Sequence, residues 1–261
     1  RGMGVKVIEI PTDPETGSSV EALELALEQW PIKGIIVVTN CNNPLGFIKP
    51  DARKRAVLSL AQRHDIVIFE DDVYGELATE YPRPRTIHSW DIDGRVLLCS
   101  SFSKSIAPGL RVGWVAPGRY HDKLMHMKYA ISSFNVPSTQ MAAATFVLEG
   151  HYHRHIRRMR QSYQRNLALY TCCIREYFPC EICITRPKGG FLLWIELPEQ
   201  VDMVCVARQL CRMNIQVAAG SIFSASGKYR NCLRINCALP LSETYREALK
   251  QIGEAVYRAM E

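Results

Sequence analysis

The residues best suited to chemistry stand in short polar clusters beside apolar runs of the sequence. Each cluster follows or opens an expected strand. The clusters are Asn43-Pro44-Leu45-Gly46, Glu70-Asp71-Asp72-Val73-Tyr74, Ser101-Phe102-Ser103-Lys104 and Gly109-Leu110-Arg111. Ligands of an open parallel sheet gather at the carboxyl ends of its strands, so this spacing predicts one rim that carries all of these side chains.

An amine, a carboxylate, an amide and a phenol on one rim favour Schiff-base chemistry. The amine of Lys104 can condense with an aldehyde. An aldehyde cofactor with a ring nitrogen needs an acid that keeps this nitrogen protonated, and Asp71 is the candidate. A phenolic oxygen on the same ring needs donors, which Asn43 and Tyr74 can supply.

The remaining side chains of the rim suit a phosphate dianion. Hydroxyl groups and a guanidinium bind phosphate well, because the guanidinium donates two parallel hydrogen bonds. Ser101, Ser103 and Arg111 supply these groups. The sequence therefore predicts a site for a phosphorylated aldehyde.

Strands that alternate with helices must position this rim. The apolar runs predict strands, and periodic segments predict helices from Ser18 or Ser19 to Trp30 and from Pro50 to His64. The expected strands are Val5–Ile10, Ile35–Thr39, Ile66–Glu70, Val96–Ser100 and Val112–Ala116. This order favours an α/β fold with a doubly wound, mostly parallel sheet.

The second half of the chain predicts a smaller α+β domain. The pattern becomes helical from about Tyr120, and an apolar stripe at steps of three and four residues predicts a long helix. The stripe consists of Ile156, Met159, Tyr163, Leu167, Tyr170 and Ile174. Short strands (181–185 and 191–197) and two helices (202–213 and 242–259) follow. We expect a partial large domain over residues 1–165 and a small domain over residues 166–261.

Composition excludes several classes of protein. The 261 residues are 47% hydrophobic and carry a net charge of +6, which does not suit a disordered polyelectrolyte and does not by itself indicate a nucleic-acid partner. No apolar run approaches the ~18 residues of a membrane span. The ten cysteines are scattered, and Cys180/Cys183 lacks a second pair, so we expect buried reduced thiols in a cytoplasmic protein and no metal site.

Four of these segments resemble the class I/II aminotransferases, which are pyridoxal 5'-phosphate (PLP) enzymes of fold type I. The matching segments are N-N-P-L-G (42–46), D-D-V-Y (71–74), S-F-S-K-S-I-A-P-G-L-R-V-G (101–113) and C-L-R-I-N (232–236). Their order and gaps match the family, and the similarity extends from the first residue to the end of the chain. The resemblance implies PLP as cofactor and a fold-type-I large domain.

The resemblance also implies roles for individual residues. Lys104 would form the Schiff base and move a proton, with Asp71 on the pyridine nitrogen and Tyr74 on the ring oxygen as the other catalytic groups. Asn43 would donate to the same oxygen and lie beside the substrate. The phosphate ligands would be Ser101, Ser103 and Arg111. Arg234 would bind the α-carboxylate of an amino acid, although an arginine extending from a small-domain strand to solvent is the alternative.

A narrower resemblance concerns residues 150–163 and the segment E-D-D-V-Y. These resemble the effector domain of MocR-type regulators, a subfamily of the GntR-like bacterial transcription factors. The implied protein senses PLP or an amino acid, forms a homodimer, and contacts DNA only through an N-terminal domain outside this chain. A free-standing aminotransferase of the 2-aminoadipate or kynurenine type is the competing interpretation.

The family pattern begins upstream of Arg1, so we expect a truncated fragment. A glycine-containing phosphate turn, a ring-stacking aromatic residue and two strands of the family lie outside this sequence. We therefore expect Val5–Ile10 to be displaced from the sheet or to pair with another molecule. We also expect weakened or abolished PLP binding, and no activity, in the fragment.

Simpler explanations compete at single positions. Glu70 and Asp72 are expected to be a loop acid and a turn or cap residue. The basic run 151–160 is expected to be a solvated helix face, with contact to phosphate or DNA as the alternative. Ser101–Lys104, Ser133–Asn135 and Lys188–Gly190 also match the motifs of penicillin-binding acyl-enzymes, where Ser101 would be the nucleophile. That fold needs a helix starting at Ser101, which Pro108 and Gly109 disfavour.

Overall fold

The computed structural model describes residues 4–261, which divide into two compact units. The large unit consists of Ile10–Asn42 and Phe47–Arg160. The small unit consists of Asn43–Gly46 and Gln161–Glu261, together with the residues up to Glu9. The division at Arg160 falls inside one long helix. Each unit is described by itself.

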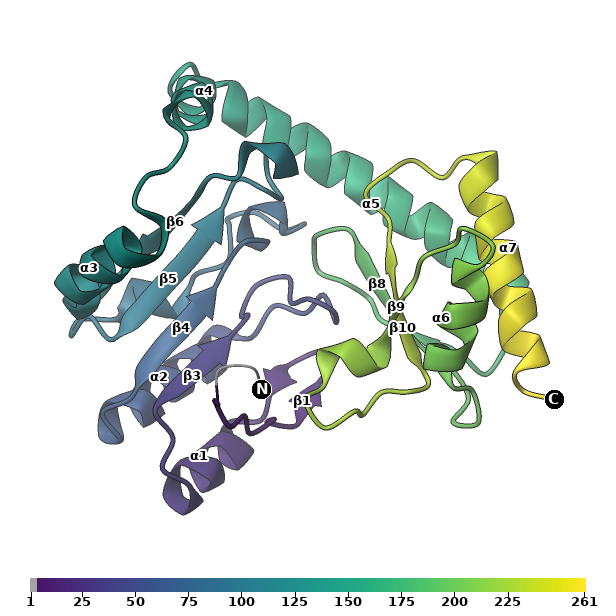
Figure 1. Ribbon diagram of the computed structural model, residues 1–261, viewed down its shortest axis with the longest axis horizontal. Helices are drawn as coiled ribbons and strands as arrows, with labels where there is room; N and C mark the ends of the chain where they lie inside the picture. Colours follow the sequence, from purple (N-terminus) through teal and green to yellow (C-terminus); the bar gives the residue numbers. More distant parts are fainter. Residues whose placement is uncertain (1–3) are drawn as a thin grey trace. The chain divides into compact units, whose positions relative to one another are not determined.

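A four-stranded sheet forms the centre of the large unit (Figure 1). Its order is β3-β4-β5-β6, with bounds Gly34–Val37, Val67–Asp71, Val96–Ser101 and Gly113–Ala116. The pairs β3/β4 and β4/β5 are parallel and β5/β6 is antiparallel, so the predicted mostly parallel sheet is confirmed.

Two helices pack their apolar sides against this sheet. In α1 (Val20–Gln29) the Ser19 hydroxyl accepts a hydrogen bond from Ala22 N at 3.1 Å, which caps the helix start. Leu23 of α1 and Val57 of α2 (Asp51–Arg63) join a core that includes Ile68 and Val96 of the strands. Each such side chain contributes about 1.5–3 kcal/mol by leaving water.

Short helices and two further α-helices complete the large unit. Their bounds are η1 Gly75–Leu77, η2 Ile87–Trp90, η3 Pro108–Leu110, η4 Gly118–Tyr120, α3 His121–Ser132 and α4 Pro137–Leu148. The described residues of α3 include no buried side chain, and α4 buries Ala143 alone.

The predicted strand at Val5–Ile10 is wrong. These residues form no strand, and the short hairpin β1 (Thr12–Asp13) with β2 (Gly17–Ser18) follows them. Val5 and Val7 are 60% and 65% exposed because no neighbouring strand covers them. The Glu9 carboxylate instead accepts hydrogen bonds within the small unit, from Ser224 Oγ at 2.9 Å and Ser226 N at 3.1 Å. The expected displacement from the sheet is therefore confirmed.

An antiparallel sheet and two helices form most of the small unit. The strand order is β7-β8-β10-β9, with bounds Cys183–Ile184, Leu192–Glu196, Cys232–Asn236 and Ala218–Ala219. The helices are α6 (Met203–Cys211) and α7 (Glu243–Arg258), and η5 (Gly220–Phe223) follows β9. Asp202 and Ser242 cap α6 and α7 as their side chains suggest.

The long helix α5 spans His151–Tyr177 and confirms the predicted stripe. Tyr152 and Ile156 are buried in the first half, and Leu167, Tyr170 and Ile174 in the second. Within residues 4–261, no helix combines the length and the apolar character that crossing a bilayer requires.

Gly253 allows α7 to lie directly against the C-terminal end of α5. A Cβ atom at this position would stand 2.2 Å from the carbonyl oxygen of Tyr177. We expect Gly253→Ala to lower the free energy of unfolding by at least about 2 kcal/mol, because backbone cannot yield as a side chain does. Urea unfolding measures this loss. Glu254→Ala, an exposed neighbour, should change it by less than about 0.5 kcal/mol, and equal effects of the two variants would contradict the packing argument.

The ten cysteines are all free, and their burial differs from the expectation. Four are buried: Cys41, Cys173, Cys232 and Cys237. Five are exposed: Cys172, Cys180, Cys183, Cys205 and Cys211. The prediction of burial is thus wrong for half of them, because apolar neighbours in the sequence do not decide which side of a helix, strand or turn faces water.

The buried thiols predict a stability that falls at alkaline pH. Burial raises the pKa of Cys41 and Cys232 to about 12 and also raises the pKa of Cys237. Above pH ~8.5 these thiols ionise in the unfolded chain and stay protonated in the folded one, so the unfolded state binds fewer protons. The folded state therefore loses roughly 2 kcal/mol per thiol by pH 10.

Urea unfolding at pH 8 and pH 10 under reducing conditions measures this effect. Burial lowers the pKa of Lys49 to about 8 and also lowers the pKa of Lys54, and these two groups oppose the trend. The variant Cys41→Ala/Cys232→Ala/Cys237→Ala should show a much flatter pH dependence. An unchanged slope would contradict the assignment to these thiols.

Candidate functional site

The strand ends of the large unit bring Asp71, Ser101 and Gly113 to one edge. Asp71 is the last residue of β4 and pairs with Cys99 of β5, so Ser101 lies two residues further along the neighbouring strand. Ser101 in turn pairs with Gly113 of β6. A Cβ atom on Gly113 would stand 3.0 Å from the Ser100 carbonyl oxygen, so the glycine permits the close approach of β6 to β5. Figure 1 shows these strands side by side.

Lys104 lies in a tight turn directly after β5. Phe102 N donates to Val112 O at 3.0 Å and Ser103 N donates to Ser101 Oγ at 3.3 Å, which holds the start of the turn, and Ile106 N donates to Phe102 O at 2.8 Å at its end. The lysine side chain is half-buried. Within the described part of the chain, its amine makes no hydrogen bond or ion pair, so it is available for a ligand.

Arg111 adopts a left-handed backbone conformation, with φ 52° and ψ 35°. This conformation is unusual for a residue other than glycine and is often retained at functional positions. The residue lies two positions before Gly113, and its exposed guanidinium has no ion pair among residues 4–261. The register therefore places Arg111 on the same edge as Ser101 and the Lys104 turn.

Tyr74 stands in the turn that follows β4. The Asp71 carboxylate accepts a hydrogen bond from Val73 N at 3.2 Å, which holds the start of this turn. Tyr74 itself is buried, and its carbonyl oxygen accepts a hydrogen bond from Leu77 N at 2.8 Å. The turn thus presents Asp71 and Tyr74 from one short segment.

A buried network of charged side chains centred on Asp72 lies next to this turn, and no sequence pattern predicted it. The Asp72 side chain is fully buried, forms an ion pair with Arg83, and accepts a hydrogen bond from Asn40 Nδ2 at 2.8 Å. Arg83 Nε also donates to Glu76 Oε1 at 2.6 Å. Burial raises the pKa of Asp72, and the Arg83 charge opposes this rise. Asp72 does open the turn, since its carbonyl oxygen accepts a hydrogen bond from Gly75 N at 3.4 Å, but its side chain has this further, buried ionic role.

Glu70 is not a loop acid. It belongs to β4, is fully buried, and accepts a hydrogen bond from Thr39 Oγ1 at 2.6 Å. It also accepts hydrogen bonds from the backbone N–H groups of Ile87 and His88, at 2.8 and 3.0 Å. Its role in the large unit is to join the end of β3 to η2.

Two predicted site residues, Asn43 and Arg234, belong to the small unit and form a pair there. Arg234 Nη1 donates to Asn43 Oδ1 at 2.9 Å, and the guanidinium lies over the Phe223 ring at 5.1 Å. Arg234 Nε is buried and has no hydrogen-bond partner within residues 4–261. An unsatisfied guanidinium donor of this kind suits an incoming carboxylate better than a purely solvated arginine.

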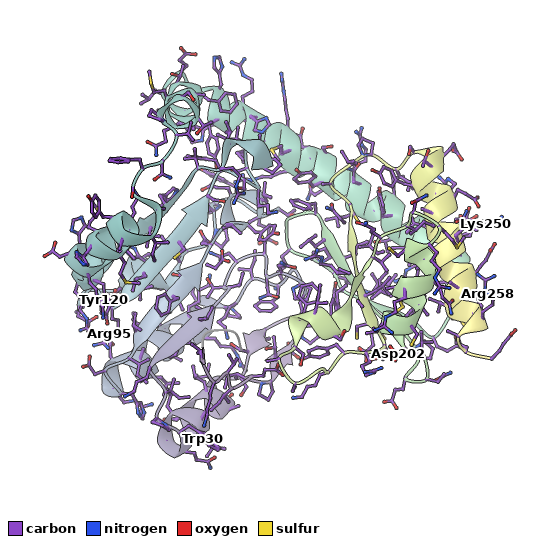
Figure 2. The ribbon with its side chains drawn as sticks, in the orientation of Figure 1. Trp30, Arg95, Tyr120, Asp202, Lys250 and Arg258 are labelled. Atoms are coloured by element: carbon purple, nitrogen blue, oxygen red, sulfur yellow. The ribbon has the colours of Figure 1, made fainter. Side chains whose placement is uncertain are left out.

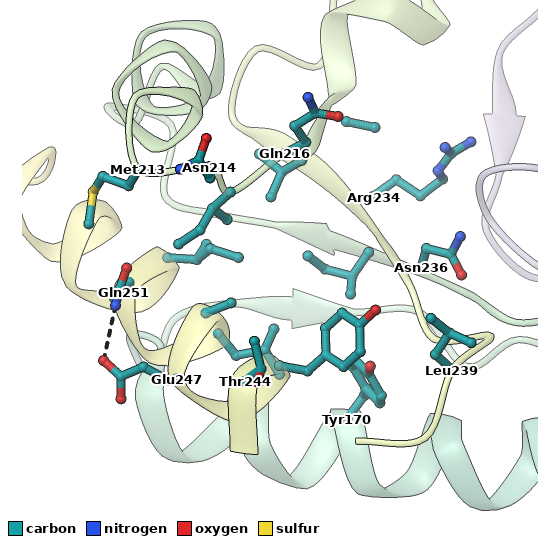
Figure 3. Close-up of a pocket in the computed structure, with 18 of the residues that line it drawn as sticks. Tyr170, Met213, Asn214, Gln216, Arg234, Asn236, Leu239, Thr244, Glu247 and Gln251 are labelled. Atoms are coloured by element: carbon teal, nitrogen blue, oxygen red, sulfur yellow. Dashed lines mark hydrogen bonds between the residues drawn. The ribbon is translucent and has the colours of Figure 1, made fainter. Parts of the chain in front are cut away.

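The small unit also contains a cavity of about 650 Å³ lined by β9, β10, α7 and part of α5 (Figure 3). Its wall is mainly apolar, with Gln251 donating to Glu247 at 3.1 Å on one side. Arg234 contributes to the wall, but its side chain extends away from the other labelled residues. The cavity therefore does not coincide with the Arg234 and Asn43 pair.

The donor set of the large unit suits a phosphorylated aldehyde with a basic ring. One edge of the sheet carries these groups: a carboxylate at the end of β4, two hydroxyls and an amine at the end of β5, and a guanidinium before β6. Among residues 4–261 no group of histidine, cysteine and acidic side chains suits a metal ion. The acyl-enzyme alternative finds no support, because Ser101 ends a strand and a turn follows it.

The fold is that of the fold-type-I aminotransferases. A kynurenine aminotransferase from Pyrococcus horikoshii aligns with a TM-score of 0.89 at 27% identity, covering 97% of this chain and 64% of that structure. The α-aminoadipate aminotransferase LysN from Thermus thermophilus aligns with a TM-score of 0.88 at 25% identity, covering 97% of this chain and 66% of that structure. The family model for aminotransferase class I and II matches residues 1–252, so the chain belongs to this family.

Curated relatives extend the comparison. The chain is 97% identical over 261 residues to the uncharacterized HTH-type transcriptional regulator YjiR of Escherichia coli (strain K12), covering 56% of that protein. It is 27% identical over 260 residues to a 2-aminoadipate transaminase of Thermus thermophilus, covering 98% of this chain and 65% of that protein. The chain thus spans about half to two thirds of the length of these relatives.

Proposed function

We propose that this chain is the PLP-binding, aminotransferase-like effector domain of a bacterial transcription regulator. The observation that carries the proposal is the edge of the large unit, where Lys104 has a free amine beside Ser101 and Arg111 and next to the β4 end with Asp71. The regulator assignment is supported by the 97% identity to a protein named as an HTH-type regulator and by the large part of that protein outside the match.

Each residue would have a defined task at this edge. PLP, when bound, supplies an aldehyde that condenses with an amine and a ring that accepts electrons. Asp71 would hold a proton on the ring nitrogen, and Tyr74 would donate to the ring oxygen. Ser101, Ser103 and Arg111 would bind the phosphate.

The small-unit pair would recognise the amino acid. Asn43 already orients Arg234 through the 2.9 Å hydrogen bond, and Phe223 supports the guanidinium plane. The unpartnered Nε leaves a donor for a carboxylate oxygen. We propose that Arg234 binds the α-carboxylate and that Asn43 keeps the guanidinium in position.

We further propose that the intact protein works as a homodimer in the cytoplasm. Exposed apolar side chains on and between α3 and α4 support a second copy as the partner. Ile131, Phe134 and Leu148 are 79%, 86% and 85% exposed, which is a large apolar surface to leave in water.

A free-standing aminotransferase remains the second candidate, favoured by the likeness to the kynurenine and α-aminoadipate enzymes. The test uses the full-length gene product with operator-containing genomic DNA and a panel of amino acids. The proposal predicts that PLP together with an amino acid changes DNA affinity, without sustained conversion of amino acid and 2-oxo acid. Sustained turnover with no effect on DNA would overturn it in favour of the enzyme.

A further inference from the structure

The outer face of α5 carries a positive stripe without counter-charges. The arginines of the stripe follow at steps of three, one and seven residues, which places them on one side of a helix. They are Arg154, Arg157, Arg158 and Arg165, and all are exposed. Within residues 4–261, none of them makes an ion pair or a side-chain hydrogen bond. Arg160 differs, because its Nε donates to the Glu76 carbonyl oxygen at 2.7 Å.

The positive charge is concentrated on α5 and is not spread evenly over the helices of the chain. Helix α5 contains six arginines and a single acid, Glu176, next to its last residue. Helix α7, in contrast, interleaves acids and bases along its sixteen residues. Unneutralised charge of one sign on one face creates a field that attracts a polyanion.

The inner face of the same helix touches the loop that holds Lys104. The Tyr152 ring packs edge-on against Phe102 at 6.0 Å. A side-chain hydrogen bond between Tyr152 and Ser105 adds a second contact to this loop. One helix therefore carries the candidate cofactor loop on its inner side and the free arginines on its outer side.

We propose that the α5 stripe binds the phosphate backbone of duplex DNA. This inference rests on the proposed function, which makes DNA a polyanion that the intact protein binds. Guanidinium groups suit phosphate oxygens, and Arg154 to Arg165 extend over about 16 Å of helix, where a duplex presents roughly one charge per 1.7 Å. A membrane surface suits the stripe less well, because an interfacial helix needs a free apolar face, and Tyr152 and Ile156 are already buried in the core.

The test measures binding of the 261-residue chain to a 30-base-pair duplex of arbitrary sequence at several salt concentrations. The stripe variant is Arg154→Gln/Arg157→Gln/Arg158→Gln. The matched control is Arg208→Gln/Lys250→Gln/Arg258→Gln, which removes the same charge from α6 and α7; Lys250 and Arg258 are labelled in Figure 2. Circular dichroism and urea unfolding verify that both variants fold.

The stripe variant should bind at least about tenfold more weakly, and the slope of log K against log salt should fall by about 2.7, because each lost phosphate contact removes about 0.9. The control should retain nearly the wild-type slope. Equal losses in the two variants, no duplex binding by the wild type, or binding only to anionic phosphatidylglycerol vesicles would each overturn the inference. PLP labelling of Lys104 in the full-length protein should be equal with and without the stripe substitutions, so a failure of the cofactor proposal is seen separately.

Discussion

Replacing Lys104 by alanine is expected to weaken PLP binding by the full-length protein about 100-fold, roughly 2.7 kcal/mol of binding free energy. The reason is that the amine is the only group of the edge that can condense with the aldehyde. Ser101, Ser103 and Arg111 would still hold the phosphate, so weak binding should remain. Fluorescence titration of the protein with PLP measures both affinities.

Lys104→Arg is the matched control, because it keeps the positive charge but cannot condense. It should bind PLP as weakly as the alanine variant. Wild-type affinity in the arginine variant would show that charge alone holds the cofactor, which contradicts the role given to Lys104.

Replacing Arg83 by methionine is expected to destabilise the large unit by about 3–5 kcal/mol. The substitution removes the ionic partner of a fully buried carboxylate, and an uncompensated buried charge is strongly unfavourable. Among residues 4–261, the Asp72 carboxylate would keep only the hydrogen bond from Asn40 Nδ2. Urea unfolding of the single variant, followed by a double-mutant cycle with Asp72→Asn, measures the effect.

The double variant Arg83→Met/Asp72→Asn should recover much of the loss, because position 72 then carries no unpaired buried carboxylate. Arg83→Lys should cost less than methionine because it keeps the charge. A double variant as unstable as the single one would show that Arg83 acts through packing rather than through the Asp72 charge.

Much of the large-unit architecture followed from the sequence. Continuous apolar runs such as 66–70 and 96–100 predict strands, and the structure has β4 and β5 there, although Phe69 of β4 is 40% exposed. The run at Val5–Ile10 has the same local pattern but forms no strand, because a strand also needs a neighbour. The local pattern predicts that a segment can form a strand, and pairing with a neighbouring strand decides whether it does.

The site residues at the strand ends could be predicted from the sequence, whereas the buried ion pair between Asp72 and Arg83 could not. Asp71, Ser101 and Lys104 follow apolar runs, so their common edge could be inferred from the topology of parallel sheets. The Asp72 and Arg83 pair joins residues eleven positions apart with no periodic signal. Such a contact depends on the path of the chain after η1, which no local rule specifies.

The basic run on α5 is a second feature whose charge partners the sequence does not predict. The sequence suggested a solvated face, and the structure does expose Arg154 and Arg157. The structure also shows that, among residues 4–261, no acidic side chain forms an ion pair with Arg154 or Arg157, and this could not be inferred from the sequence. Charge balance on a surface is a property of the fold rather than of one helix.

The most direct test of the central claim is to identify which residue of the full-length protein PLP modifies. The protein is mixed with PLP, reduced with borohydride, digested and analysed by peptide mass spectrometry. We predict that the cofactor mass lies on Lys104 and that the Asp71→Ala variant carries much less of it. Labelling spread over surface lysines, or concentrated on a lysine other than Lys104, would contradict the account.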